Sequence, residues 1–248
     1  MEKKIGKEFM EMTKYQNLGV YPQKEGVPMP PIELPLIRDE EIIELPDGKA
    51  LALEALDLQE LIEKRQSLRK YADEPLSMEE LAYLMWGTQG VKRVTDRPVS
   101  FRTVPSAGSR HPFETYLLIN KVDGLTPGLY RYLALDHKLA KLNGFDGIRD
   151  ELTNACLKQK HVFNSAVTFT WVAVPERTTW RYGNRGYRYI HLDAGHVCQN
   201  LYLLAESIGC GICAIAAFDD DQANQALRLD GEDQFVIYLA SLGKRGEA

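Results

Sequence analysis

The sequence predicts one compact α+β domain preceded by an extended N-terminal arm. Three features predict this: prolines cluster early in the chain, long segments of helical periodicity follow, and β-branched runs are scattered among those segments in mixed order. The 248 residues suffice for one large domain. We place the arm at residues 1–54 and the domain at residues 55–248.

Prolines dominate the second half of the arm. Five of them lie between residues 22 and 35, and a sixth stands at position 46. Proline lacks a backbone N–H and has a fixed φ, so this segment is expected to be extended or polyproline-like and not helical. Two interpretations stay open: an arm that wraps over the body of the protein or a partner subunit, and a flexible linker.

Helical spacing of apolar residues begins at residue 55. One segment ends near Arg65, and Ser77 with Glu80 has the spacing of a capping box that opens the next helix. Gly87 and Gly209 are expected to end their helices. The predicted helices cover residues 55–65, 77–87, 147–163, 191–209 and 219–229.

Strands are predicted where apolar, aromatic and β-branched residues follow one another between turn signals. The run "AVTFTWVAV" is almost continuously apolar and predicts a strand buried on both faces. The turn "DGLTPG" separates two further strands. The predicted strands cover residues 114–122, 128–136, 166–174, 211–218 and 234–245.

Composition and charge limit the classes of function. A net charge of −5 and a pI near 5.6 give no support for nucleic acid or an anionic membrane as a partner. No apolar run approaches the ~18 residues that span a bilayer, and the N-terminus lacks the apolar part of a secretory signal. Four cysteines do not resemble a disulfide framework, so a reducing cytoplasm is the expected compartment.

The familiar signatures of metal and nucleotide sites are missing. Cys210 and Cys213 form a C-x-x-C, but no second pair exists, so buried thiols are favoured over a metal or redox site. His191 and His196 are five residues apart, which does not suit a zinc pair on a helix. We therefore expect no metal. The sequence also contains no P-loop, no G-x-G-x-x-G after a strand and no G-x-S-x-G.

Basic residues provide the first candidate ligand site. Arg65, Ser67 and Arg69 are spaced two apart, so in an extended chain their side chains project to one side and form a receptor for phosphate. A solvated basic corner between two helices explains the same pattern. Lys244 and Arg245 follow the last predicted strand and either complete that phosphate site or are simply solvated.

Two further stretches suggest a flat ligand. Residues 105–109, "PSAGS", are small and would let backbone N–H groups approach a flat or anionic ligand, although a plain loop explains them too. Residues 180–189 alternate arginines with aromatic residues, as in stacking sites and in protein interfaces. We favour a loop next to a ligand or at a subunit interface over nucleic-acid binding.

Taken in order, these stretches resemble the nitroreductase superfamily and, more narrowly, its SagB-type (thiazole/oxazole dehydrogenase-like) branch. The resemblance covers residues 55 to 245 and is most specific in "GYRYIHLDAGHVCQNLYL"; it also includes "RQSLRKYADEPLSMEELAYLMWGTQG", "RTVPSAGSRHPFETY" and "YLASLGKR". It implies a sandwich with a mainly antiparallel central sheet flanked by helices. It also implies an intertwined homodimer with two FMN sites at the subunit interface.

The resemblance also implies roles for individual residues. Arg65 and Ser67 would hold the FMN phosphate or ribityl chain, and Arg69 would face the pyrimidine end of the ring. A second group, supplied by the partner subunit, would line the isoalloxazine: Pro105, Ser106, Ala107 and Ser109. The N5 side of the flavin ring would be lined by Ile215, Ala216 and Ala217. The phosphate would be contacted by Lys244 and Arg245.

Two departures from the family pattern affect the expected chemistry. Many nitroreductases carry Glu-Gly where this chain has Ala216 and Ala217, so no carboxylate is available there for proton transfer near N5. The Lys-Tyr pair of the azoline-oxidising relatives corresponds to Arg181 and Tyr182. Arginine stays protonated and is no base, so azoline oxidation is not expected. Arg181 and Tyr182 remain the candidate catalytic residues, with Tyr182 as a proton donor.

Two functions follow as hypotheses. The first is an FMN-dependent oxidoreductase that passes a hydride through the flavin between NAD(P)H or an organic substrate and an acceptor, by a ping-pong mechanism. The organic substrate includes, as one option, a modified peptide. The second is an FMN-fold subunit of a peptide-modifying complex with little or no turnover.

Overall fold

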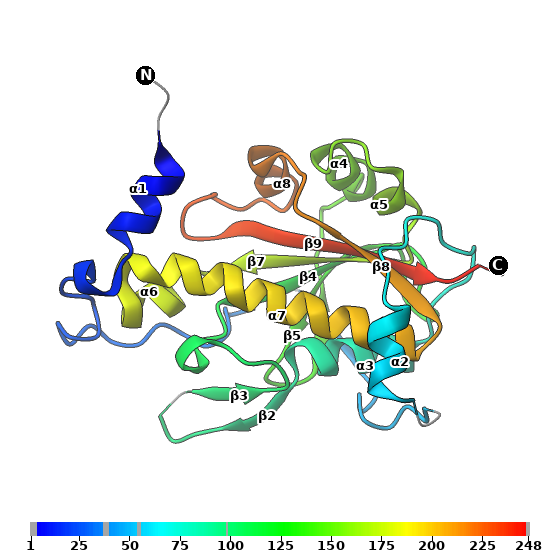
Figure 1. The fold of residues 1–248 in the computed structure, drawn as a ribbon. Coiled ribbons are helices and arrows are strands. Elements are labelled where there is room, and N and C mark those ends of the chain that lie inside the picture. Colours follow the sequence, from blue (N-terminus) through cyan, green and yellow to red (C-terminus); the bar gives the residue numbers. More distant parts are fainter. Residues whose placement is uncertain (1–3, 37–39, 54–55, 98, 247–248) are drawn as a thin grey trace.

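A seven-stranded sheet forms the centre of the chain in the computed structural model (Figure 1). The structure describes residues 4–36, 40–53, 56–97 and 99–246. The strand order is β1-β6-β5-β4-β7-β9-β8, and every neighbouring pair is antiparallel. The predicted α+β class with a mainly antiparallel sheet is therefore confirmed. The strands are β1 (Glu41–Glu44), β4 (Phe113–Ile119), β5 (Gly128–Leu133), β6 (Lys138–Lys141), β7 (Val167–Ala173), β8 (Cys210–Ile215) and β9 (Phe235–Lys244).

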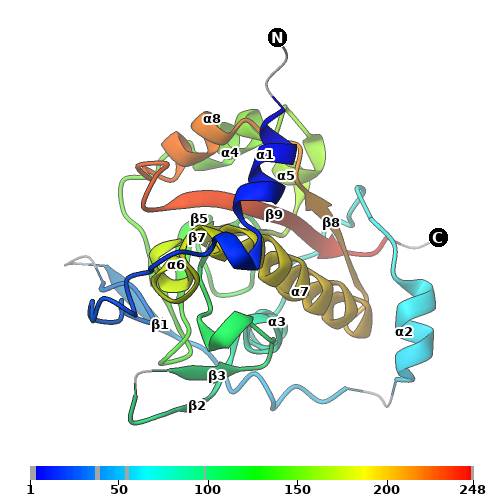
Figure 2. The same ribbon diagram turned by 60° about the vertical axis from the view of Figure 1, so that its left-hand side comes forward.

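Helices cover both faces of this sheet (Figures 1 and 2). The long helix α7 (Gly186–Ser207) lies across one face beside α3 (Met78–Gln89) and α6 (Glu176–Tyr182). The opposite face carries α4 (Ile148–Ala155), α5 (Lys160–Asn164) and α8 (Asp220–Ala226). Outside these layers lie α1 (Ile5–Met12), α2 (Leu58–Lys64) and a separate hairpin of β2 (Val91–Val94) and β3 (Ser100–Arg102).

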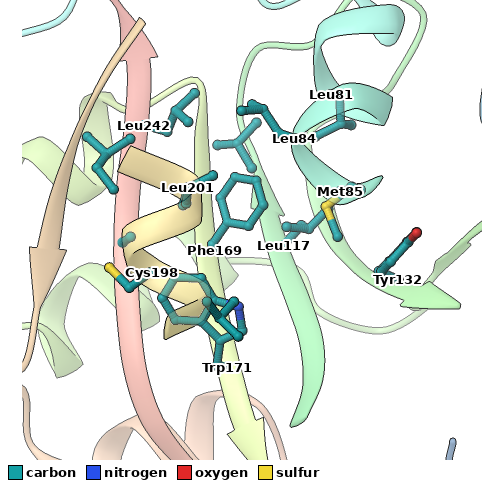
Figure 3. Close-up of a cluster of buried hydrophobic side chains, with 14 of the residues drawn as sticks. Leu81, Leu84, Met85, Leu117, Tyr132, Phe169, Trp171, Cys198, Leu201 and Leu242 are labelled. Atoms are coloured by element: carbon teal, nitrogen blue, oxygen red, sulfur yellow. The ribbon is translucent and has the colours of Figure 1, made fainter. Parts of the chain in front are cut away.

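Alternation along β7 explains why the chain has a core on each face. Phe169 and Trp171 point toward α7 and pack with Leu201, while Val172 belongs to the second cluster under α4 and α8 (Figure 3). Successive side chains of a strand point to opposite faces, so a strand that is apolar at every position requires cover on both. The predicted burial of "AVTFTWVAV" is confirmed.

Local signals set the ends of the main helices. Ser77 and Glu80 make the predicted capping box in front of α3. Gly209 follows α7 with φ +67°, a left-handed conformation that glycine adopts without strain. Gly87 does not end α3, because the helix continues to Gln89; a Cβ at Gly87 would lie 2.2 Å from Leu204 Cδ1, so this glycine permits close contact with α7.

Two sequence expectations on secondary structure are wrong. The helix expected over 147–163 is two short helices, α4 and α5, because Leu157 and Lys158 adopt positive φ between them. The aromatic and arginine-rich stretch over 180–189, expected as a loop, is largely helical. It contains the end of α6, a short 3-10 turn (Gly183–Arg185) and the start of α7.

The described part of the arm lies on the body of its own chain. β1 adds an edge strand next to β6. Further back, buried arginines bind backbone carbonyls of the proline-rich segment: Arg177 donates to Pro31 O at 2.8 Å and Arg131 to Pro35 O at 3.0 Å. The boundary predicted between residues 54 and 55 lies outside the described residues. No helix in the described part of the chain is long and apolar enough to cross a membrane.

Candidate functional site

The first cluster of predicted site residues gathers around Tyr202, near the C-terminal end of α7. The Tyr202 hydroxyl lies 2.9 Å from Ser67 Oγ and accepts the backbone N–H of Ala214 at 3.1 Å. The Arg65 guanidinium sits 5.1 Å above the ring of Tyr202. Tyr202 therefore joins the basic segment 65–69 to strand β8.

Backbone contacts hold that basic segment in the extended form in which its alternate side chains project to one side. Leu68 donates its N–H to Ile212 O at 2.8 Å, and Ser67 forms a parallel bridge with Ile212. The close approach requires glycine on the sheet: a Cβ at Gly211 would lie 2.6 Å from Leu68 Cδ2, and one at Gly243 would lie 2.7 Å from Tyr71 Cγ. The segment is thus built against the edge of the sheet.

The cations of this cluster differ in their partners. Among the residues that the structure describes, no carboxylate lies within 4.0 Å of Arg65 or Arg69. Lys244, in contrast, forms an ion pair with Glu80, and Arg245 binds Glu206 at 2.5 Å. An incoming anion would meet uncompensated charge at Arg65 and Arg69. At Lys244 and Arg245 it would compete with carboxylates.

The titratable groups His161 and Cys213 lie close to Arg69 and are uncharged. Burial lowers the pKa of His161 and raises the pKa of Cys213, and the charge of Arg69 acts on both groups. His161 Nδ1 lies 2.8 Å from Ser241 Oγ, which also contacts the Tyr71 hydroxyl at 2.8 Å. These uncharged groups leave the charge of Arg69 available to a ligand.

The end of β8 belongs to the same cluster. Ile215 is buried, whereas Ala216 and Ala217 are exposed directly after the strand. The Gln159 side chain donates to Ala217 O at 2.9 Å, and Gln159 Oε1 lies 3.0 Å from His161 Nε2. The small side chains at 216 and 217 leave an open surface beside the basic segment.

A second cluster lies around Asp193, nearer the N-terminal end of α7. Ser106 donates to Asp193 Oδ2 at 2.6 Å, and the N–H of Ala107 lies 3.2 Å from Asp193 Oδ1. Ser106 Oγ also accepts the N–H of His111 at 2.8 Å. Burial raises the pKa of Asp193, while these hydrogen bonds favour its ionised form. Asp193 fixes the loop at 105–109.

Arg181 and Tyr182 lie against that same loop. Gly108 has φ +58°, and a Cβ at this position would lie 2.4 Å from Tyr182 Oη and 3.3 Å from Arg181 Cδ. Tyr182 also packs edge-on against Tyr189, with ring centroids 4.9 Å apart. The loop and the two residues predicted as catalytic therefore form one unit within a single chain.

The two clusters are separated along α7. Asp193 and Tyr202 are nine residues apart, which is about 13 Å along a helix that rises ~1.5 Å per residue. One chain sets residues 65, 67 and 69 against β8, with residues 215–217 at one end of that strand and residues 244 and 245 beside its other end. It sets residues 105–109, 181 and 182 together nearer the start of α7. Within one chain these are two separate clusters, and we refer to each as a candidate half-site.

Sequence reasoning did not single out the two organising residues, Tyr202 and Asp193. Both lie within "HLDAGHVCQNLYL", where they occupy buried positions of an amphipathic helix. The sequence pattern therefore does not distinguish them from core residues. The four cysteines are free and buried, as predicted for packing thiols. In the described part of the chain, no group of three or more His, Cys, Asp and Glu side chains could hold a metal ion.

Comparison with known proteins decides the family. The profile of the Nitroreductase family matches residues 62–244. A nitroreductase homologue from Methanocaldococcus jannaschii is 35% identical over 205 residues, which is 83% of this chain and 97% of that protein. The chain belongs to the nitroreductase family. The family predicted from the sequence is thus confirmed.

Other relatives of this nitroreductase-family protein are longer than it is. The trifolitoxin-processing protein TfxB of Rhizobium leguminosarum bv. trifolii is 28% identical over 141 residues, which is 52% of this chain and 36% of TfxB. A nitroreductase-type crystal structure from Anabaena variabilis is 32% identical with a TM-score of 0.65 and covers 77% of this chain. This chain spans 38% of the Anabaena chain.

More distant structures share the fold alone. The NADPH:FMN oxidoreductase of Vibrio harveyi, complexed with NAD+, is 17% identical with a TM-score of 0.54, over 76% of this chain and 69% of that chain. The E. coli microcin synthetase McbBCD complex with a truncated pro-peptide gives 19% identity and a TM-score of 0.60, over 98% of this chain and 92% of the matched chain.

Proposed function

We propose that this protein is an FMN-dependent oxidoreductase that works as a homodimer, with each flavin held between the two subunits. The observation that best supports this proposal is that the predicted site residues fall into two half-sites along one helix. Neither half-site alone offers both a basic pocket for phosphate and the loop that would line the ring. A second copy of the chain would supply the missing half.

The exposed surface of α7 supports such a pairing. His191, Leu192, Gly195, His196 and Gln199 are all exposed at helical spacing between the two half-sites, and Leu192 is 60% exposed. Gly195 has no atom within 4 Å of the position of a Cβ, so the surface is flat at the middle of this stretch. A two-fold axis near this point would set the Asp193 cluster of one subunit beside the Tyr202 cluster of the other.

The residues present suit FMN. Arg65 and Arg69 offer uncompensated charge for a phosphate and for an electron-rich ring. Ser67 provides a hydroxyl already oriented by Tyr202. The exposed Ala216 and Ala217 leave room for a flat ring system beside the sheet. Lys244 and Arg245 would contribute to phosphate binding after exchange of their carboxylate partners.

FMN, when bound, supplies hydride-transfer chemistry, and the chain supplies position and charge. Arg69 would stabilise negative charge on the ligand through its guanidinium, since its neighbours Cys213 and His161 are uncharged. The methyl side chain of Ala216 has no ionisable group and cannot transfer a proton. The Tyr182 hydroxyl, held against Gly108, is the group of the second half-site that would donate a proton, while Arg181 would remain a fixed cation.

The proposed electron donors and acceptors follow from the fold and the relatives. The Vibrio neighbour supports NAD(P)H as a donor, and the similarity to TfxB supports the SagB-type branch, with a modified peptide as one class of organic substrate. One site would serve both substrates in turn. This predicts ping-pong kinetics.

Steady-state kinetics test the proposal. The FMN-loaded protein is assayed with NADH and with NADPH at several concentrations of a nitroaromatic or quinone acceptor. Parallel double-reciprocal lines are expected for at least one donor. Lines that clearly intersect would contradict a shared site.

A second function is favoured by the similarity to the two trifolitoxin proteins TfxB and TfxC, the latter 24% identical over 192 residues. In that case the chain would be an FMN-fold subunit of a peptide-modifying complex with little or no turnover. Retained FMN that neither NADH nor NADPH reduces would favour this alternative.

A further inference from the structure

A separate cavity lies on the opposite face of the sheet from α7, beside α8 and strands β5 and β6. Its volume is about 640 Å³, which is within the range of small-molecule sites. Leu142, Phe145, Leu227 and Leu229 form apolar walls, and Tyr116 and Arg131 lie on the sheet beneath. Neither half-site described above contributes a residue to it.

Arg131 is the unusual residue of this cavity. It stands directly opposite Tyr116 in the pairing of β4 with β5, and only 5% of it is exposed. One terminal nitrogen donates to Pro35 O, but its buried Nε has no hydrogen-bond partner. In the described part of the chain no carboxylate lies within 4.0 Å of its guanidinium. A buried cation without a paired anion is costly, so an anion is expected nearby.

The carboxylates that line the cavity do not fill this role. Asp230 is already engaged, because it accepts the N–H groups of Glu232 at 2.8 Å and Gln234 at 2.9 Å. Burial raises the pKa of Glu40 while the nearby charge of Arg131 lowers it, but the Glu40 carboxylate lies beyond 4.0 Å of the guanidinium and its buried Oε2 lacks a hydrogen-bond partner. Neither carboxylate is therefore in direct contact with the Arg131 guanidinium.

A second arginine lines the same cavity. The Arg228 guanidinium stacks 4.1 Å above the ring of Phe145 and donates to Gly144 O. It places a cation at the rim, above an aromatic wall, while Arg131 places one at the base. An apolar space with a cation at each end suits a molecule with a flat apolar body and an anionic group.

We propose that this cavity binds a small organic carboxylate with an aromatic or otherwise flat apolar body, with its carboxylate at Arg131. The proposal does not depend on the flavin function. The rings of Phe145 and Tyr116 would contact the body of the ligand.

Binding of 2-naphthoate tests the proposal, with uncharged 2-naphthamide as the matched control. Both are titrated into the full-length, FMN-loaded protein by calorimetry and saturation-transfer NMR, while the flavin spectrum is recorded. We expect saturable binding of naphthoate, binding of naphthamide at least ~10-fold weaker, and no change in the flavin spectrum.

Two variants locate the probe. Arg131→Gln should weaken naphthoate binding at least ~10-fold, since it removes a charge-assisted contact. Leu229→Trp should block binding by filling the cavity and leaves Arg131 intact, which keeps the test valid if Arg131→Gln does not fold. Absence of saturable binding to the wild type would overturn the proposal. Binding that both folded variants retain would also overturn the proposal, because the probe would then lie elsewhere. If Arg131→Gln does not fold, binding that Leu229→Trp retains would overturn it for the same reason.

Discussion

Tyr202 and Asp193 are polar side chains that face the interior of the chain from the same helix. Tyr202 is 9% exposed and Asp193 is 3% exposed, and each is satisfied by hydrogen bonds to a segment far away in sequence. Buried polar groups must be paired, and here the pairing also fixes a candidate ligand segment. At the scale of residues, core positions of α7 thus determine where the half-sites lie.

His111 supplies a prediction at this scale. Burial, together with the charges of Arg102 and Arg110, lowers the pKa of His111 to about 3. Between its ordinary pKa of ~6.5 and about 3, the unfolded chain binds a proton that the folded chain does not. The free energy of unfolding should therefore fall as the pH is lowered through this window, by on the order of 1 kcal/mol per pH unit from this residue.

Urea unfolding of the wild type and of His111→Gln, at about pH 7 and about pH 5, measures this contribution. The difference between the two pH values should be smaller in the variant. Asp193 and Glu33, whose pKa values are raised by burial, act in the opposite direction but are common to both proteins. An identical pH dependence in the two proteins would refute the assignment.

At the scale of elements, the proline-rich arm and the sheet are joined through buried charge. Arg177 at the start of α6 forms an ion pair with Glu114 on β4, and both are almost fully buried. Glu114 also accepts the N–H of Leu34 at 2.9 Å, and Arg102 donates to Ile32 O at 3.3 Å. The arm therefore completes a polar network that the sheet and α6 begin.

Removing one partner tests this connection. Arg177→Met should lower the free energy of unfolding by about 3–5 kcal/mol, because it leaves the Glu114 carboxylate buried and unpaired. Chemical unfolding measures the change, and Lys138→Met, which breaks the exposed pair with Glu44, is the control and should stay near the wild type. Equal stability of Arg177→Met and the wild type would show that the network does not hold the arm.

The sequence predicted those elements whose signals are local. The capping box at Ser77, the apolar run of β7 and the helix end at Gly209 depend on neighbouring residues, and each was predicted correctly. β1 and the β2–β3 hairpin were missed because short edge strands depend on their pairing partners. The break between α4 and α5 depends on positive φ at Leu157 and Lys158, which these residue types do not predict.

The candidate site follows the same division. The phosphate receptor at residues 65–69 was argued for an extended chain, and the structure shows Ser67 and Leu68 bonded to β8 in that form. The ion pairs of Lys244 with Glu80 and of Arg245 with Glu206 were not foreseen, because the partners lie far apart in sequence. The assignment of these residues to FMN remains a prediction.

At the scale of the whole molecule, the account requires a second copy of the chain on α7. Gly195→Trp should prevent this pairing without harming the fold of one chain, because the site of its Cβ is open in the single chain. Light scattering after size exclusion should give the mass of a monomer, and this monomer should have lost its flavin. Gln225→Trp, on the exposed side of α8, is the control and should remain dimeric. A dimeric, flavin-loaded Gly195→Trp protein would contradict the proposed interface.

The FMN content of purified protein tests the central claim most directly. The wild type should be yellow and release one FMN per chain, identified by chromatography of the released chromophore. Arg65→Ala/Arg69→Ala should release much less, since each charge-assisted bond is worth about 1.5–3 kcal/mol. Arg93→Ala/Arg97→Ala, which removes two exposed arginines from the β2–β3 hairpin, should match the wild type. A colourless wild type that takes up no added FMN, or full flavin content in the Arg65/Arg69 variant, would contradict the account.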